Sequence, residues 1–275
     1  MSQYFKEYGR ALEMLRKIDS YTGEKIQNFR KDVYDLVKYI SIYEQIEKAL
    51  PDVKAYEINP EHCDSRSNKN IKANTIEEMC DEIKQLCNNK DKNFILAYND
   101  NPDGLLHKYG TTSDEVKEFI LNAEKNIEKL CNDLKKTNTL VIISADHGHI
   151  DIKKTYNVLD MEEIQDCIIM PPSLESRAIT FWVKEDKKEK FEMIFEENFK
   201  DEFILYTKEE FLNKKFLGDG TKHRKIDDFI GNYIAMAISD SIIKIETDIS
   251  KEKKNKKSTH CGLTEDEMIV PLILI

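Results

Sequence analysis

The sequence predicts an α/β fold with a central, mostly parallel sheet and helices on both of its faces. Three patterns support this prediction: the apolar runs FILAY (94–98) and TLVIIS (139–144), and the long amphipathic stretch between them. Continuous apolar runs of this length are typical of strands that are covered on both faces. A strand–helix–strand unit is almost always a right-handed crossover between parallel strands. We therefore expect both strands to lie in one sheet, adjacent or as near neighbours.

Local patterns predict where the other elements begin. Thr75 and Glu78 have the spacing of a capping box, and Thr112 and Glu115 repeat it ahead of the long helix. In both segments apolar residues then recur every three or four positions, which indicates one buried face. The remaining predictions are a charged helical segment at 1–50, strands at 53–58, 178–183 and 268–275, helices at 188–199 and 229–238, and a solvated loop at 248–258.

Composition limits the classes of function. The 275 residues carry 42 Lys+Arg and 52 Asp+Glu, so the formal net charge is −10. Nucleic-acid binding is not expected, because it needs clustered cations. No apolar run approaches the roughly 20 residues of a membrane span, and the charged start does not resemble a signal peptide. The six cysteines form no C-x-x-C pair, which favours reduced thiols and a cytoplasmic protein without membrane association.

Two Asp/His motifs follow the two apolar strands. Asp103 and His107 form a D-x-x-x-H after the first strand, and Asp146 and His147 lie in ADHGH after the second. Parallel strands end at the same edge of a sheet, where open α/β sheets bind ligands. Asp oxygens and His nitrogens are the ligands expected for zinc, manganese or iron. Each motif alone is more simply a cap or a loop, but together with His260 in THCGL they favour a shared metal site.

In their order along the chain, PDGLLH, ADHGH and HCGLTEDEMIVPL resemble the alkaline phosphatase superfamily, and within it the type I phosphodiesterase and nucleotide pyrophosphatase group. The resemblance runs from about residue 90 to the end. It implies an alkaline phosphatase-like fold and a metal-dependent hydrolase of phosphoric esters. It also implies two divalent metal ions, usually zinc, with manganese as the alternative. The substrate implied is a small-molecule phosphate ester.

The resemblance assigns roles to individual residues. It implies that Asp103, His107 and His260 bind one metal ion, and that Asp146 and His147 bind the second. His149, which ends the ADHGH motif, is a candidate for contact with the substrate. Over 1–275 we expect a single domain of this type, with 160–255 as a candidate cap or specificity insertion.

The sequence departs from the family pattern at its start. Family members begin with a strand that ends in a metal-binding Asp, followed by a helix that a Ser or Thr nucleophile opens. Residues 1–50 contain neither pattern, and SQYFKEYGRALEM looks like the segment that follows the nucleophile. No catalytic nucleophile is identified. We therefore expect an N-terminally incomplete domain with little activity by itself.

Two other functions remain open. One is a remnant without catalysis that acts as a binding or regulatory domain, and the other is an enzyme similar to the phosphomutases. The sequence indicates neither the natural substrate nor the oligomeric state. His62, His223, Arg224 and Arg177 are interpreted as loop residues. For His223, Arg224 and Arg177 the alternative is contact with a substrate phosphate.

Overall fold

The computed structural model describes residues 2–6, 8–13, 18–20, 22–26, 40–65, 67–245 and 256–275. The chain divides into two compact units. Unit 1 comprises Met1–Leu36 and His147–Ile269, and unit 2 comprises Val37–Asp146 and Val270–Ile275. The boundary falls inside the ADHGH motif. A single domain over 1–275, with 160–255 as its cap, stays a prediction.

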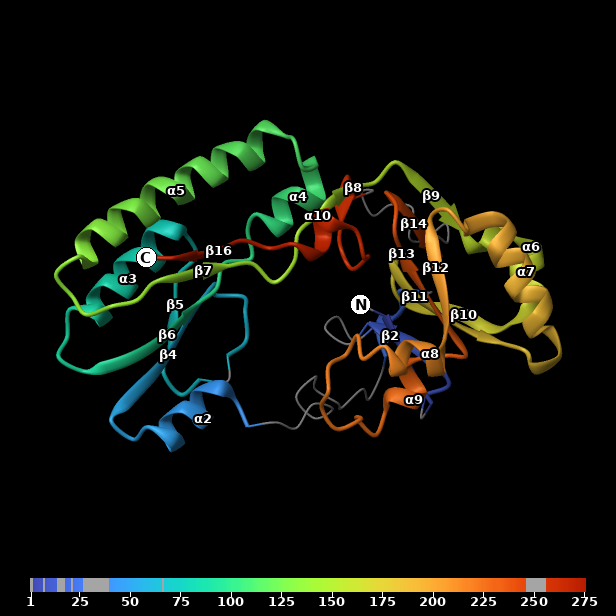
Figure 1. The fold of residues 1–275 in the computed structure, drawn as a ribbon, viewed down its shortest axis with the longest axis horizontal. Helices are drawn as coiled ribbons and strands as arrows, with labels where there is room; N and C mark the ends of the chain where they lie inside the picture. Colours follow the sequence, from blue (N-terminus) through green and yellow to red (C-terminus); the bar gives the residue numbers. More distant parts are fainter. Residues whose placement is uncertain are drawn as a thin grey trace. The chain divides into compact units, whose positions relative to one another are not determined.

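Unit 2 contains a parallel sheet of three strands in the order β5-β4-β6 (Figure 1). These are β4 (Val53–Asn59), β5 (Asn70–Lys72) and β6 (Lys92–Ala97). A separate antiparallel pair joins β7 (Ile142–Ser144) to β16 (Leu272–Leu274). Both apolar runs of the sequence therefore form strands. The expectation that one sheet holds them is wrong among the described residues, because β6 pairs with β4 and β7 pairs with β16.

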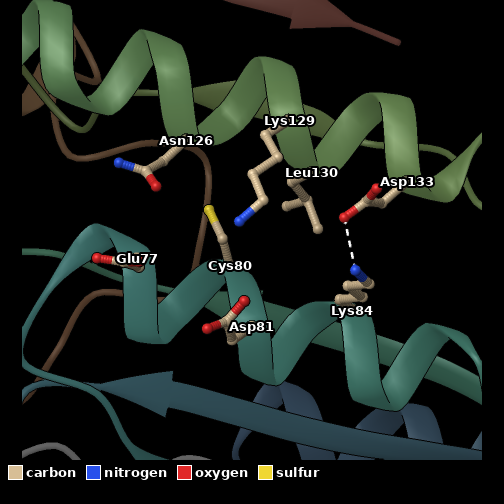
Figure 2. Close-up of a pocket in the computed structure, with 8 residues that line it drawn as sticks. All are labelled: Glu77, Cys80, Asp81, Lys84, Asn126, Lys129, Leu130 and Asp133. Carbon is tan, nitrogen blue, oxygen red and sulfur yellow. Dashed lines mark hydrogen bonds and ion pairs between the residues drawn. The ribbon is translucent and has the colours of Figure 1, made fainter.

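Helices α3 (Ile76–Cys87) and α5 (Asp114–Leu134) pack side by side in unit 2 (Figure 2). Thr75 caps α3 in a complete capping box, which confirms the predicted start. Helix α5 begins one residue later than predicted, because Ser113 rather than Thr112 accepts the capping hydrogen bond. The two other helices described in unit 2 are α2 (Ile42–Ala49) and α4 (Asp103–Tyr109).

The contact between α3 and α5 is apolar at its centre and charged at its rim. Cys80 and Leu130 are buried there, while Lys84 Nζ lies 2.6 Å from Asp133 Oδ2 (Figure 2). Burial raises the pKa of the Cys80 thiol to about 11, so this thiol stays protonated. The cavity between the helices measures about 10 Å³, which is room for a single water molecule. It is a small packing gap rather than a ligand site.

Unit 1 is built on a seven-stranded antiparallel sheet in the order β12-β13-β11-β10-β1-β2-β3 (Figure 1). Its strands are β1 (Ser2–Phe5), β2 (Arg10–Glu13), β3 (Ile18–Asp19), β10 (Ile168–Glu175), β11 (Ala178–Val183), β12 (Phe203–Thr207) and β13 (Tyr233–Ala237). Its core is aromatic: Phe181 on the sheet packs against Phe191 and Phe195 on helix α7.

The shorter elements of unit 1 surround this sheet. The helices are α6 (Glu162–Cys167), α7 (Lys188–Phe199), α8 (Lys208–Asn213), α9 (Ile226–Phe229), α10 (Glu265–Met268) and the 3-10 turns η1 (Val158–Asp160) and η2 (Glu185–Lys187). The strands β9 (Lys154–Asn157) and β14 (Ser241–Lys244) form a parallel pair, and β8 (Ile150–Asp151) and β15 (Ser258–Thr259) form an antiparallel pair. No helix among the described residues combines the length and apolar character that crossing a membrane requires.

Several sequence predictions for unit 1 can be compared with these elements. The strand at 178–183 and the helix at 188–199 are confirmed. The helix predicted at 229–238 is wrong: its centre is β13, whose five residues are all buried between β11 and β12. A short apolar run does not distinguish a buried strand from a buried helix.

The predicted helical segment at 1–50 is wrong at its start, where the chain forms β1, β2 and β3, and is confirmed at its end, where Ile42–Ala49 form α2. Residues 27–39 of that segment lie outside the described residues, as do residues 246–255, which cover most of the predicted loop at 248–258. The end of that loop prediction is wrong, since Ser258 belongs to β15.

Candidate metal centre

Three histidine rings of unit 1 gather at the end of the β8–β15 pair. Ile150 lies opposite Thr259 in this pair, so the next residues outward, His149 and His260, face each other. Their ring centroids are 5.1 Å apart, and His147 stacks on His260 at 3.7 Å with an interplanar angle of 14°. One ring nitrogen from each of the three lies within 4.8 Å of the others. The structure thus brings together the histidines of ADHGH and THCGL.

Each of these rings is oriented through its Nδ1 atom. His149 Nδ1 lies 3.1 Å from Ser258 Oγ, and this histidine is buried. His147 Nδ1 lies 3.0 Å from a neighbouring backbone carbonyl oxygen, and His260 Nδ1 lies 3.0 Å from Cys261 Sγ. Ligand histidines in metal sites typically contact the protein through one ring nitrogen and the ion through the other. The three Nε2 atoms are therefore the ones suited to an ion.

The donor set fits a divalent transition-metal ion. Imidazole nitrogen is a preferred ligand of zinc and of other first-row metals. Two nitrogens on one tetrahedral zinc ion, at about 2.0–2.1 Å from it, lie roughly 3.4 Å apart. The nitrogens of His147, His149 and His260 lie within 4.8 Å of one another, so the cluster is compact enough to supply imidazole ligands to bound metal ions.

Close packing requires the glycine at the centre of ADHGH. The Gly148 N–H donates to the carbonyl oxygen of Glu267 at 2.8 Å. A Cβ atom at Gly148 would lie 1.9 Å from the backbone oxygen of Asp266, which is far inside van der Waals contact. Both oxygens belong to α10. Glycine therefore lets the segment between the two histidines run directly against this helix.

A buried ion pair holds the loop that follows His260. Arg177 Nε and Nη2 each lie 2.6 Å from an oxygen of Glu267, and both side chains are almost fully buried. The Glu267 carboxylate also accepts from the Gly262 N–H at 2.7 Å and from Thr264 Oγ1 at 2.6 Å. Burial opposes ionisation of Glu267, but its hydrogen-bond donors, led by Arg177, outweigh this and lower its pKa.

Arg177 lies in the turn between β10 and β11, as its interpretation as a loop residue predicts, but the expectations of a solvated side chain and of a phosphate contact are wrong. Its guanidinium is inaccessible to solvent and is satisfied by Glu267 and by two backbone carbonyl oxygens. The sequence does contain a signal for the start of α10, since Thr264 and Glu267 have capping-box spacing. It contains none for the ion pair, whose partners are 90 residues apart. His223 and Arg224 are exposed, as their interpretation as loop residues predicts.

In unit 2, acidic residues and histidines gather where β4 and β6 end. Asp103 and His107 lie four residues apart on one face of α4, with Asp103 Oδ1 3.4 Å from His107 Nε2. His62 follows β4 in an exposed turn, and its Nε2 lies 3.2 Å from an oxygen of Asp100, which follows β6. Two Asp/His pairs thus occupy the carboxyl-end edge of the parallel sheet.

The Tyr98 hydroxyl reports the negative charge at this edge. Burial raises its pKa, and the charges of Asp146, Asp100 and Asp103 raise it further. The carboxylates that follow β6 and β7 are therefore within electrostatic range of one side chain. Concentrated negative charge of this kind favours a bound cation.

The predicted ligands are divided between the units. Unit 2 contains Asp103, His107 and Asp146, whereas unit 1 contains His147, His149 and His260. Asp146 and His147 are consecutive in the chain, so one peptide unit connects the two groups of residues.

A family model supplies the assignment. The model for type I phosphodiesterase / nucleotide pyrophosphatase matches residues 17–259 of this chain. The chain belongs to this family. Membership of the type I phosphodiesterase / nucleotide pyrophosphatase family makes it a phosphoric-ester hydrolase by class, as the motifs implied. No curated protein matches the sequence significantly.

Solved structures agree on the fold of this family member. Murine ectonucleotide pyrophosphatase / phosphodiesterase 5 is 16% identical with a TM-score of 0.66; the match covers 99% of this chain and 70% of the murine one. Phosphonoacetate hydrolase from Sinorhizobium meliloti 1021, in complex with phosphonoformate, is 13% identical with a TM-score of 0.64. That match covers 99% of this chain and 73% of the bacterial one. These likenesses confirm the predicted alkaline phosphatase-like α/β fold.

Proposed function

We propose that this chain hydrolyses small phosphoric esters with the help of two divalent metal ions, zinc in the first place and manganese as the alternative. Asp103, His107 and His260 hold one ion in this proposal, and Asp146 and His147 hold the other. The observation that carries it is the histidine cluster of unit 1, in which rings from two distant motifs come within ligand range of one another.

The carboxylates of unit 2 support the same proposal. Asp103 and His107 form an oxygen–nitrogen pair on one helix face, and Asp146 adds negative charge near Tyr98. Mixed carboxylate and imidazole donors are typical of hydrolytic metal centres. Bound there, divalent cations supply charge that stabilises the phosphoryl oxygens during transfer.

The remaining polar groups have tasks of their own in this proposal. His149, positioned by Ser258, contacts the substrate. The Tyr98 hydroxyl stays protonated at neutral pH, because burial and the nearby carboxylates raise its pKa, so it can donate a hydrogen bond to a phosphoryl oxygen. No Ser or Thr of this sequence is identified as the nucleophile, so we expect slow turnover by this chain alone.

The substrate class and the compartment also belong to the proposal. An inactive variant of the murine relative was solved with AMP, and the bacterial relative with phosphonoformate. We propose ligands of the same chemistry here, compact phosphate or phosphonate anions. All six cysteines are unpaired thiols, which is consistent with the reducing environment of the cytoplasm.

Metal content tests the site directly. The chain is reconstituted with zinc or manganese, dialysed, and analysed by elemental mass spectrometry, next to His260→Ala and His107→Ala. Each variant should lose bound metal, because a ligand is removed. His223→Ala makes the same chemical change at an exposed histidine and should keep the wild-type content. Unchanged metal in both ligand variants would refute the assignment.

Hydrolysis tests the activity separately. We expect slow, metal-dependent release of nitrophenol from bis- and mono-(4-nitrophenyl) phosphate, and its loss in Asp146→Ala. Stoichiometric metal without any turnover would support a binding or regulatory domain instead. Transfer of phosphate to an acceptor without net hydrolysis would support the phosphomutase alternative.

A further inference from the structure

Cys261, which follows a histidine of the cluster, has an unusual backbone conformation. Its φ angle is 88°, in the left-handed region that glycine adopts readily and other residues rarely adopt. Among the described residues, Leu174 and Lys215 share this feature. Lys215 lies just after α8, where a left-handed residue commonly ends a helix. Cys261 instead comes two residues after the end of β15, so a helix terminus does not explain its conformation.

The backbone on both sides of Cys261 is held by contacts with other elements. Thr259, two residues before it, is paired with β8. The Gly262 N–H donates to the Glu267 carboxylate at 2.7 Å, and the Leu263 N–H donates to a carbonyl oxygen at the end of β13, also at 2.7 Å. A strained residue persists where its surroundings fix the backbone in this way, and such residues gather at functional sites.

The strained backbone places the thiol of Cys261 beside the ring of His260. The Sγ atom lies 3.0 Å from His260 Nδ1, within hydrogen-bond distance, and the thiol is half-buried. The face of the same ring is stacked on His147, with 3.7 Å between the ring centroids. The His260 ring is therefore in contact with a sulfur at one edge and with a second imidazole on one face.

The sulfur contact bears on the form of the imidazole that a metal ion needs. A neutral imidazole carries one proton, and a ring that binds an ion through Nε2 carries that proton on Nδ1. The Nδ1–H group then needs an acceptor. Metal-binding histidines usually donate this N–H to a carboxylate, a backbone carbonyl or a water molecule. Cysteine sulfur also accepts hydrogen bonds, although weakly.

We infer that Cys261 is the positioning residue of His260: its sulfur accepts a hydrogen bond from Nδ1–H and thereby keeps Nε2 unprotonated and available to the metal ion. The inference rests on the proposed metal site. It gives the sulfur no place on the ion itself, because the group of donor atoms that lie within 4.8 Å of one another includes those of the three histidines and, among the described residues, not that of Cys261.

Nitrogen-15 NMR of the metal-free protein tests the hydrogen bond without relying on metal binding. At about pH 8, where an ordinary imidazole is neutral, the side-chain shifts show which ring nitrogen carries the proton. His260 should be protonated at Nδ1 in the wild type and in Cys261→Ser, whose hydroxyl accepts the same hydrogen bond. In Cys261→Ala the population should move towards the form protonated at Nε2. A wild-type ring protonated at Nε2 would overturn the inference.

Zinc titration with a chromophoric chelator as competitor measures the consequence for the ion. Cys261→Ala and Cys261→Gly should each bind zinc at least about tenfold more weakly, as loss of an orienting partner typically does, and Cys261→Ser should stay close to the wild type. Glycine relieves the strain at this φ angle and alanine does not, so the glycine variant should have the higher urea midpoint of the two. Equal loss of zinc at unequal stability would distinguish positioning from a structural role.

Lys215→Gly is the matched control, because it relieves the same kind of strain at an exposed position outside the histidine cluster and should leave zinc affinity unchanged. Wild-type zinc affinity in Cys261→Ala would refute the inference alone. Absence of zinc from the wild type would refute the proposed metal site, and the protonated nitrogen of His260 would still decide the hydrogen bond. In cobalt-substituted protein, a sulfur-to-cobalt charge-transfer band that disappears in Cys261→Ser would make Cys261 a ligand and overturn its positioning role.

Discussion

Arg177 and Glu267 form a two-point ion pair in the interior of unit 1, with N–O distances of 2.6 Å and side-chain exposures of 0% and 1%. Arg177 lies in the turn just before β11, and Glu267 lies in α10. The Glu267 carboxylate also accepts hydrogen bonds from the Gly262 N–H and the Thr264 hydroxyl. The backbone carbonyl oxygen of Glu267 accepts one from the Gly148 N–H. The pair therefore supports both segments that carry the histidine cluster.

Arg177→Met should destabilise unit 1 by about 3–5 kcal/mol, because it leaves the buried Glu267 carboxylate without its cation. Urea unfolding followed by the fluorescence of Trp182, the single tryptophan, measures this. The double variant with Glu267→Met removes both charges and should be more stable than the single variant. Lys92→Met breaks an exposed pair with Asp52 and should hardly move the midpoint. A single variant as stable as the wild type would contradict the role of the pair.

Lowering the pH should reduce the stability that the Arg177–Glu267 pair gives to unit 1. The pKa of Glu267 lies below its usual value of 4.5 in the folded chain, since its hydrogen bonds outweigh the effect of burial. A lowered carboxyl pKa stabilises the fold above pH 4.5, and that stabilisation is lost as the pH falls through the lowered value. Urea midpoints measured from about pH 6 down to about pH 3 should show the loss.

Glu267→Gln should flatten this acid dependence, although the variant starts from a lower stability. Glu196→Gln makes the same change at an exposed position of α7 and should retain the wild-type dependence. An acid dependence that is equally steep in Glu267→Gln and in the wild type would count against Glu267 as its source.

Gly148→Ala should disturb the histidine cluster without touching any side chain in it. The new Cβ would lie 1.9 Å from a backbone oxygen of α10, which cannot move away as a flexible side chain could. We expect a lower urea midpoint and loss of bound zinc. Gly220→Ala adds the same atom where nothing lies within 4 Å, and should leave both unchanged. Normal zinc content in Gly148→Ala would show that the close approach to α10 does not shape the site.

Ser258→Ala removes the hydroxyl that contacts His149 Nδ1 at 3.1 Å. Because His149 contacts the substrate in our proposal and one such hydrogen bond contributes about 1 kcal/mol, we expect the KM for bis-(4-nitrophenyl) phosphate to rise about fivefold, and steady-state kinetics measures this. Ser173 is the matched control, because its hydroxyl is buried without a hydrogen-bond partner in the described part of the chain. Equal KM values in Ser258→Ala and Ser173→Ala would mean that His149 is not positioned through Ser258 for the substrate.

Elements that depend on near neighbours in the chain were predictable. The capping box at Thr75 and the helix at 188–199 follow from contacts three or four residues apart, and the structure contains both. The order of the Asp/His motifs was also sufficient to indicate the family that the chain belongs to. Strand β13 was mistaken for a helix, because burial on both sides of a sheet removes the alternation that identifies a strand.

The sequence by itself determined the family, through the order of its Asp/His motifs, and the start of capped helices such as α3, since motifs and capping signals are short-range properties of the chain. Only the tertiary structure decided which distant segments meet. The β8–β15 register makes His149 face His260, the side chain of His149 contacts Ser258, 109 residues away, and Arg177 contacts Glu267 across 90 residues. It also decided that β6 and β7 take different partners. Such contacts depend on long-range chain closure and shared burial, for which neighbouring residues provide no pattern.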